Sequence, residues 1–96
     1  MRSLRLKMIR RDVIYKGRVQ RVGFRWTVNH LAKGFDVSGF VENRSDGTVY
    51  MAVEGSENEV NAFMNSISAN MTTNIIDAVI KEAVPIGNDT SFSVHY

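Results

Sequence analysis

The sequence contains no cysteine, a single proline and no long uncharged apolar segment. Without cysteine the chain has no disulfide, no thiolate metal ligand and no cysteine nucleophile, and we expect a cytoplasmic protein because its composition suits a reducing compartment. Its apolar runs fall far short of the ~20 residues of a membrane-spanning helix, so we expect no membrane insertion. The N-terminus is basic, but Arg5 and Lys7 interrupt any signal-peptide core. We therefore interpret residues 1–9 as a short basic arm.

Acidic residues are almost missing from the first third of the chain. Residues 1–34 hold ten of the twelve Lys and Arg residues but only one of the ten acidic residues, whereas the whole chain has a net charge of only +2. This asymmetry indicates an anionic ligand near the N-terminal third, which leaves nucleic acid, an acidic lipid surface and a small phosphate or carboxylate as alternatives.

The 96 residues predict one domain over residues 1–96, since a chain of this length has no apolar surplus for a second core. We expect a monomer. The apolar spacing predicts two helices, one that begins near Val22 to Phe24 and stops at Gly34, and one that follows Ser56. Five strands are expected at residues 12–19, 35–42, 48–54, 75–84 and 92–96.

Short local signals mark the boundaries of these elements. The stretch NRSDG, residues 43–47, has the residue types of a hairpin turn. Ser56 and Glu59 have the spacing of a capping box, in which each side chain accepts from the other's backbone N–H. The resulting order, βαββαβ with a short C-terminal strand, predicts an α+β ferredoxin-like two-layer sandwich with two helices on one face of a mainly antiparallel sheet.

The stretch GRVQRVGFR, residues 17–25, contains three arginines, two glycines and no carboxylate. If a helix begins within it, the first helical N–H groups lack partners and, with the helix dipole, favour an anion. Arg25 then lies in the first turn, where a cation opposes the dipole by about 0.3 to 1 kcal/mol. A bound anion would reverse that sign. The alternative is an arginine that extends into water, and the stretch lacks the Lys-Ser or Lys-Thr pair of a Walker motif.

The same stretch, followed by GFVENRSDGTV at residues 39–49, resembles the acylphosphatase family, whose pattern is G-x-V-Q-G-V-x-F-R and then G-W/Y/F-V-x-N with D-G-x-V. The resemblance includes Glu54-Gly55 and the closing F-x-V-x-Y at residues 92–96, so it covers about residues 12–96. It implies hydrolysis of small acyl phosphates to a carboxylate and inorganic phosphate by water, without metal, cofactor or covalent intermediate.

The resemblance also implies roles for individual residues. Arg25 would hold the phosphoryl oxygens, and Asn43 would position the attacking water. From the residues alone, the preferred interpretation of Asn43 is a turn residue that opens the hairpin. The implied phosphate-binding loop comprises Gln20, Arg21, Val22, Gly23, Phe24 and Arg25.

Arg21 departs from the family pattern, which has glycine at this position. A left-handed backbone there costs about 1 to 2 kcal/mol for a residue with a side chain. Arg21 would tighten phosphate binding, extend into solvent or distort the loop, so a catalytically weak phosphate-binding protein remains an alternative function.

A nucleic-acid-binding module is a third hypothesis, which we rank last because Tyr15 is the only aromatic residue on the first strand and such sheets need exposed aromatics. No nucleic-acid partner is therefore expected. Trp26 and Phe40 are interpreted as packing residues, with stacking on an acyl group as the alternative. His30 and His95 lack the spacing of metal ligands, so no metal is expected.

Overall fold

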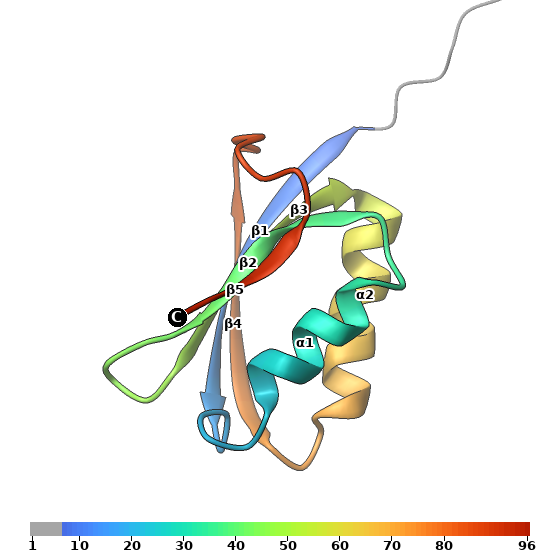
Figure 1. Cartoon of the computed structure of the whole chain (residues 1–96). Helices are drawn as coiled ribbons and strands as arrows, with labels where there is room; N and C mark the ends of the chain where they lie inside the picture. The colour runs from blue at the N-terminus through green and yellow to red at the C-terminus, as the bar shows by residue number, and fades with distance from the viewer. Residues whose placement is uncertain (1–6) are drawn as a thin grey trace, which may run out of the picture.

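The structure is a computed structural model that describes residues 7–96, which fold into a layer of two helices against a five-stranded sheet (Figure 1). The elements in chain order are β1 (Met8–Gly17), α1 (Phe24–Ala32), β2 (Val37–Asn43), β3 (Val49–Ser56), α2 (Glu57–Asn70), β4 (Ile75–Ala83) and β5 (Phe92–His95). Their order is the βαββαβ pattern with a short final strand that the sequence predicts, so the α+β sandwich is confirmed.

The strands lie in the order β4-β1-β3-β2-β5. β1 pairs antiparallel with both β3 and β4, and β2 pairs antiparallel with β3, while β5 runs parallel to β2. Both helices cover the same face of the sheet (Figure 1). The loop between β1 and α1 and the end of β2 are thereby brought to one end of the molecule.

The core lies between the helices and the sheet. Because side chains alternate across a strand, the odd-numbered residues of β1 and β3 face the helices, and Val13 pairs with Met51 with both side chains fully buried. The residues that fill this space from all layers include Val13, Phe24, Val28, Val49, Met51, Val53, Val60, Phe63 and Ile67. Neither helix within residues 7–96 has both the length and the apolar character needed to cross a membrane.

β1 begins earlier than its sequence indicates. Met8 and Ile9 belong to the arm expected over residues 1–9, yet they are the first two residues of β1. Ile9 pairs with Gly55 and is buried, because β3 extends far enough to hold the start of β1 in the sheet. The charged pair Arg10-Arg11 hid this extension in the sequence. Residues 1–6 of the expected arm lie outside the described part of the chain.

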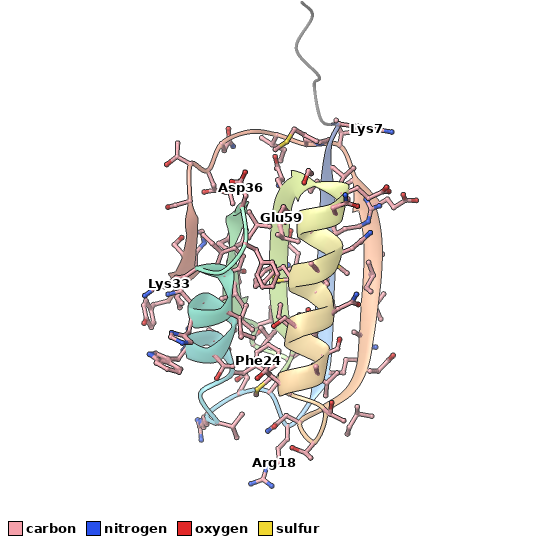
Figure 2. The ribbon with its side chains drawn as sticks, turned by 90° about the vertical axis from the view of Figure 1, so that its right-hand side faces the viewer. Lys7, Arg18, Phe24, Lys33, Asp36 and Glu59 are labelled. Carbon is pink, nitrogen blue, oxygen red and sulfur yellow. The ribbon has the colours of Figure 1, made fainter. Side chains whose placement is uncertain are left out.

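The predicted capping box forms only in one direction. Ser56 Oγ accepts from the Glu59 N–H at 3.4 Å, as expected of an N-cap. The prediction for Glu59 was wrong: its Oε1 accepts from the backbone N–H of Asp36 at 2.7 Å. Figure 2 shows Glu59, in the first turn of α2, next to Asp36, which directly precedes β2. The glutamate therefore ties α2 to the segment between α1 and β2.

Gly39 fixes the close approach of β2 to β3. Its φ is 136°, and a Cβ at this position would lie 1.9 Å from the Ala52 carbonyl oxygen, so only glycine fits. This glycine begins the GFVEN stretch and sets the register that carries Asn43 to the end of β2, opposite Val49.

Candidate active site

The loop between β1 and α1 is fastened where β1 ends. The Arg18 N–H donates to the Asn74 carbonyl at 2.9 Å, and the Asn74 side-chain amide donates to the Arg18 carbonyl at 3.1 Å. Gly17 has a φ of 127°, and a Cβ there would lie 2.5 Å from the Asn74 carbonyl oxygen. The contact with Asn74 therefore requires glycine at this position.

Gln20 fastens the middle of the loop to the β2–β3 hairpin. Its Nε2 donates to the carbonyl oxygens of Arg44 and Thr48, at 2.7 and 2.8 Å. These carbonyls belong to the two ends of the turn, where the Arg44 N–H also donates to the Thr48 carbonyl at 2.9 Å. Gln20 is thus a positioning residue, and its side chain holds the hairpin that follows Asn43.

Two left-handed residues shape the loop, Arg21 with a φ of 62° and Gly23 with a φ of 77°. Arg21 is the only residue other than glycine with positive φ in the described part of the chain. The backbone is therefore left-handed at Arg21, even though this residue carries a side chain. Loops with left-handed residues of this kind form concave arrays of N–H groups that bind anions.

The N-terminus of α1 lacks any side-chain cap or acidic residue in its first turn. Its first helical hydrogen bond runs from the Thr27 N–H to the Gly23 carbonyl at 2.9 Å. The amides of Phe24, Arg25 and Trp26 therefore precede the helical hydrogen-bond ladder. Val19 and Phe24 are almost fully buried, which holds the loop and the helix start against the core.

Arg25 is held by the last strand. Its Nη1 donates to the His95 carbonyl at 3.1 Å, and its guanidinium carbon lies 4.9 Å from the centre of the Tyr96 ring. Within residues 7–96 no carboxylate forms an ion pair with Arg25. The guanidinium is oriented by neutral groups and keeps its charge uncompensated.

Asn43 ends β2 with an unsatisfied side chain. Its Oδ1 is buried and has no hydrogen-bond partner among residues 7–96. Leaving a buried acceptor without a partner costs about 1 to 3 kcal/mol. A turn residue, the role considered for Asn43 from the sequence, would bond the nearby backbone with its side chain. In this hairpin Asp46 has that role instead, because its Oδ1 accepts from the N–H and the hydroxyl of Thr48, at 3.0 and 2.6 Å. These hydrogen bonds lower the pKa of Asp46.

One small cavity of about 220 Å³ collects most of the expected site residues. Of the predicted set, it is lined by Arg21, Gly23, Phe24, Arg25 and Asn43. Two predicted residues lie outside its lining. Gln20 contacts the hairpin as described above, and Val22 is an exposed residue of the loop.

Sequence reasoning missed the wall that β5 contributes. Val94 and Tyr96 line the cavity, because β5 pairs in parallel with β2 and ends beside α1. The closing F-x-V-x-Y was noted in the sequence, but nothing in its composition indicated a role in the site. Asn29, one helical turn beyond Arg25, also lines the cavity and was not anticipated.

Trp26 and Phe40 lie in different places. Trp26, expected to pack, is 68% exposed, lines the cavity and stacks on His30 with ring centres 5.0 Å apart. Phe40 lies on the sheet face opposite the helices and stacks on His95 at 4.2 Å, as its packing interpretation predicts. Of these two aromatic residues, only Trp26 therefore lies at the cavity.

A polar network fixes the connection that delivers β5 to the site. Glu54 accepts from the N–H groups of Ile86 and Gly87, both at 3.0 Å, and pairs with Arg10 at 2.9 Å. Burial alone would raise the pKa of Glu54, but these hydrogen bonds outweigh burial and hold the pKa below its usual value. The carboxylate thereby holds the segment between β4 and β5 against the sheet.

A guanidinium without a counter-charge, next to a helix N-terminus and a left-handed loop, suits a phosphoryl group better than any neutral ligand. The fold and this cavity thus indicate a small α+β protein with a phosphate-binding loop.

Comparison with known proteins agrees with that class. The acylphosphatase family model matches residues 11–94. The chain is 47% identical over 62 residues to an acylphosphatase from Geobacillus kaustophilus, an alignment that covers 65% of this chain and 66% of that relative, just under two thirds of its length. It is 36% identical over 86 residues to an acylphosphatase from Ligilactobacillus salivarius, which covers 88% of this chain and 94% of the relative. The crystal structure of acylphosphatase from Bacillus subtilis superimposes with a TM-score of 0.81 at 30% identity, covering 92% of this chain and 99% of that one.

The chain belongs to the acylphosphatase family, as its sequence motifs predict.

Proposed function

We propose that this chain is an acylphosphatase that hydrolyses small acyl phosphates to a carboxylate and inorganic phosphate. One observation carries the proposal: Arg25, beside the uncapped start of α1, lines the same cavity as Asn43, whose side-chain Oδ1 has no hydrogen-bond partner among residues 7–96. The first group suits the phosphoryl oxygens and the second suits a water molecule. Relatives named acylphosphatase support the same activity.

The phosphoryl group is bound by charge and by backbone donors. The amides at the start of α1 and the Arg25 guanidinium donate to its oxygens, and a guanidinium can hold two oxygens at once. In phosphoryl transfer, negative charge spreads over these oxygens in the transition state, and enzymes accelerate the reaction mainly by positioning and electrostatic stabilisation. Arg25, already oriented by the His95 carbonyl, meets this requirement with little loss of conformational freedom.

The attacking water is positioned by Asn43. Its Oδ1 accepts a hydrogen bond from the water, whose oxygen forms the new bond to phosphorus while the bond from phosphorus to the acyl oxygen breaks. The bonding electrons leave with the carboxylate, and the water's proton passes to the phosphate product or to solvent. Because the conjugate acid of the leaving group has a pKa of about 4, no general acid is needed. No metal, cofactor or covalent intermediate is part of this proposal.

Arg21 decides between turnover and binding alone. It lines the cavity and so adds a second positive charge to it. Since its backbone adopts the left-handed conformation, with a φ of 62°, we propose that Arg21 strengthens phosphate binding without distorting the loop. A protein that binds phosphate without hydrolysing acyl phosphates is the competing function.

The proposed partners are a small acyl phosphate and inorganic phosphate, in the cytoplasm. The cavity is built within a single chain, so one copy is sufficient for turnover. Nucleic acid is not proposed as a partner. Phe40 is stacked on His95, and Tyr50 lies under the Arg44 guanidinium at 4.3 Å, so the aromatic rings of the open sheet face are engaged by this chain's own side chains.

The test is hydrolysis of benzoyl phosphate by the full chain at neutral pH in the presence of EDTA. We expect metal-independent turnover that falls about 10³-fold in Arg25→Ala. Arg18→Ala is the matched control, because Arg18 belongs to the same loop but extends away from the body of the protein in Figure 2. Its rate should stay within about threefold of the original, a change of less than 1 kcal/mol.

Two results would overturn the proposal. An Arg25→Ala variant that kept most of its rate would remove Arg25 from the mechanism. A folded chain that binds phosphate by calorimetry but shows no turnover would establish the binding function instead.

A further inference from the structure

β4 is the outermost strand at one edge of the sheet. Its neighbour is β1, and no other strand in residues 7–96 pairs with it. Figure 2 shows β4 along the right-hand margin, beside α2 and not beneath it. One row of its backbone N–H and C=O groups therefore faces outward without a strand partner, which is the arrangement that pairs with another chain.

The side chains of this edge are unusually apolar. Ile80 is 51% exposed on the helix-facing side, and Val79 is 36% exposed on the other side. The cause lies in the packing, because α2 covers β1 and β3 while α1 covers β2 and β5. Both faces of the edge thus carry apolar surface that nothing in residues 7–96 covers.

We propose that β4 is a self-association edge and that its partner is the β4 strand of a second copy of this chain. The two strands pair antiparallel about a twofold axis through Val79, which joins the two sheets into one. This register places Asp77 opposite the partner's Lys81 and Ala78 opposite the partner's Ile80, and symmetry repeats both contacts. It uses residues 77–81, which pair with β1 in regular register, and avoids the irregularity between Ile75 and Asp77.

The charges of the segment favour this partner. When two copies of the segment Asp77-Ala78-Val79-Ile80-Lys81 run in opposite directions, the Asp77 carboxylate of each copy lies opposite the Lys81 ammonium group of the other. The three residues between them are apolar. Neither Asp77 nor Lys81 forms an ion pair within residues 7–96, although Lys16 and Asp12 lie opposite them on β1. An edge lysine ordinarily keeps strands apart. Here it faces an aspartate, and cross-strand pairs of opposite charge are stabilising.

The association leaves the proposed active site free. β5, which forms part of the cavity wall, lies at the opposite edge of the sheet from β4. Two strand edges bury less surface than a standard stable interface, so the dimer dissociates on dilution. This proposal replaces the sequence-based expectation of a monomer and does not depend on the proposed activity.

Sedimentation velocity over a concentration series tests the pairing. We expect a dimer to form reversibly as the chain concentration approaches about 1 mM, where an interaction with a Kd of that size is half complete. Ile80→Lys should weaken the dimer at least tenfold. Ile86→Lys is the matched control, since Ile86 is 58% exposed but lies beyond β4, and it should leave the dimer unchanged. Far-ultraviolet circular dichroism verifies that each variant is folded.

Two single charge reversals test the choice of partner and register. In a dimer of the Asp77→Lys variant, the new lysine would lie opposite the partner's Lys81. In a dimer of the Lys81→Asp variant, the new aspartate would lie opposite the partner's Asp77. Like charges repel, so each variant alone should be monomeric. Mixed together, they restore both pairs and should form a heterodimer. Val79→Cys should also cross-link across the twofold axis under mild oxidation, because residues directly opposite have Cα atoms about 4.5 to 5.5 Å apart. Val84→Cys, exposed but off the axis, should not.

The proposal is overturned if the original chain stays monomeric at about 1 mM. It is equally overturned if Ile86→Lys weakens the dimer as much as Ile80→Lys, because the contact surface then lies elsewhere. Failure of the two charge variants to combine, with each still folded, would exclude this register.

Discussion

The Nε2 atom of Gln20 lies 2.8 Å from the Thr48 carbonyl oxygen, across the gap between the loop and the β2–β3 hairpin. The same amide also donates to the Arg44 carbonyl. One side chain therefore couples the segment that would bind phosphate to the strand end that would hold water. Their separation is set by hydrogen bonds and not by loop length.

Replacing Gln20 with glutamate should uncouple the loop and the hairpin. A carboxylate has no proton to donate and would face two carbonyl oxygens, so the free energy of unfolding should fall by about 2 kcal/mol. The kcat for benzoyl phosphate should fall at a temperature where the protein is still folded. Thermal melts and steady-state kinetics measure the two effects. Gln20→Met removes the donors without adding charge and should have the smaller effect; equal behaviour of all three proteins would contradict the coupling.

Asn43→Ala should separate activity from stability. Its Oδ1 is buried without a partner, so removing it relieves a desolvation cost of about 1 kcal/mol or more, and the folded protein should be no less stable. If the oxygen positions water, kcat should nevertheless fall by about 10². Chemical denaturation and benzoyl phosphate kinetics check the two halves. A variant that loses stability but keeps its rate would show that Asn43 is structural.

Arg21→Gly should stabilise the protein and weaken phosphate binding. At a φ of 62°, glycine relieves roughly 1 kcal/mol of backbone strain. The lost guanidinium should raise the Kd of inorganic phosphate several-fold, which calorimetry measures. Arg21→Asn tests the two effects separately, because asparagine tolerates the left-handed region but carries no charge. If kcat instead rose in Arg21→Gly, distortion of the loop by Arg21 would be the correct explanation.

Glu54 should give the protein an acid-sensitive component of stability. Its pKa in the folded state is lowered, so the unfolded state binds more protons in the acid range. The resulting stability is present above the ordinary glutamate pKa of about 4.3 and is lost as the pH falls through the folded-state pKa. Glu54→Gln cannot titrate, and its unfolding free energy should fall less steeply below about pH 4.5. Parallel acid dependence in denaturant titrations of both proteins would refute this role.

Much of the architecture was predictable because each element obeys a local period. The stripe of Phe24, Val28 and Ala32 predicted α1, and alternation over residues 35–42 predicted β2, which the structure places at Val37–Asn43. Errors arose where long-range contacts decided the outcome. Ile9 extends β1 because it lies opposite Gly55, and Glu59 bonds Asp36 instead of its own N-cap. Neither partner is close in the sequence.

The site residues, too, were predictable where a local motif carries them and unpredictable where distant segments meet. Arg25, Asn43 and the loop carry a motif, and the structure brings them to one cavity. The contributions of Val94 and Tyr96 follow from the parallel pairing of β5 with β2, which no local pattern encodes. The role of Gln20 in holding the hairpin depends on carbonyl oxygens 24 and 28 residues away. Hydrogen bonds to backbone carbonyl groups do not depend on the side chain of the accepting residue, so the sequence pattern does not predict them.

The position of β5 at the end of the segment that Glu54 binds has a consequence for the order of folding. β5 reaches its place beyond β2 only after the chain has passed from β4 at the far edge of the sheet, and the Arg25–His95 hydrogen bond joins residues 70 positions apart in the sequence. Contacts between residues this far apart in the sequence form late in folding, because the chain must lose the entropy of closing a long loop before the contact can stabilise it. We therefore expect Arg25 to acquire its hydrogen bond to His95 among the last steps of folding. Recovery of the proposed acylphosphatase turnover during refolding should therefore lag behind recovery of the helical circular dichroism signal.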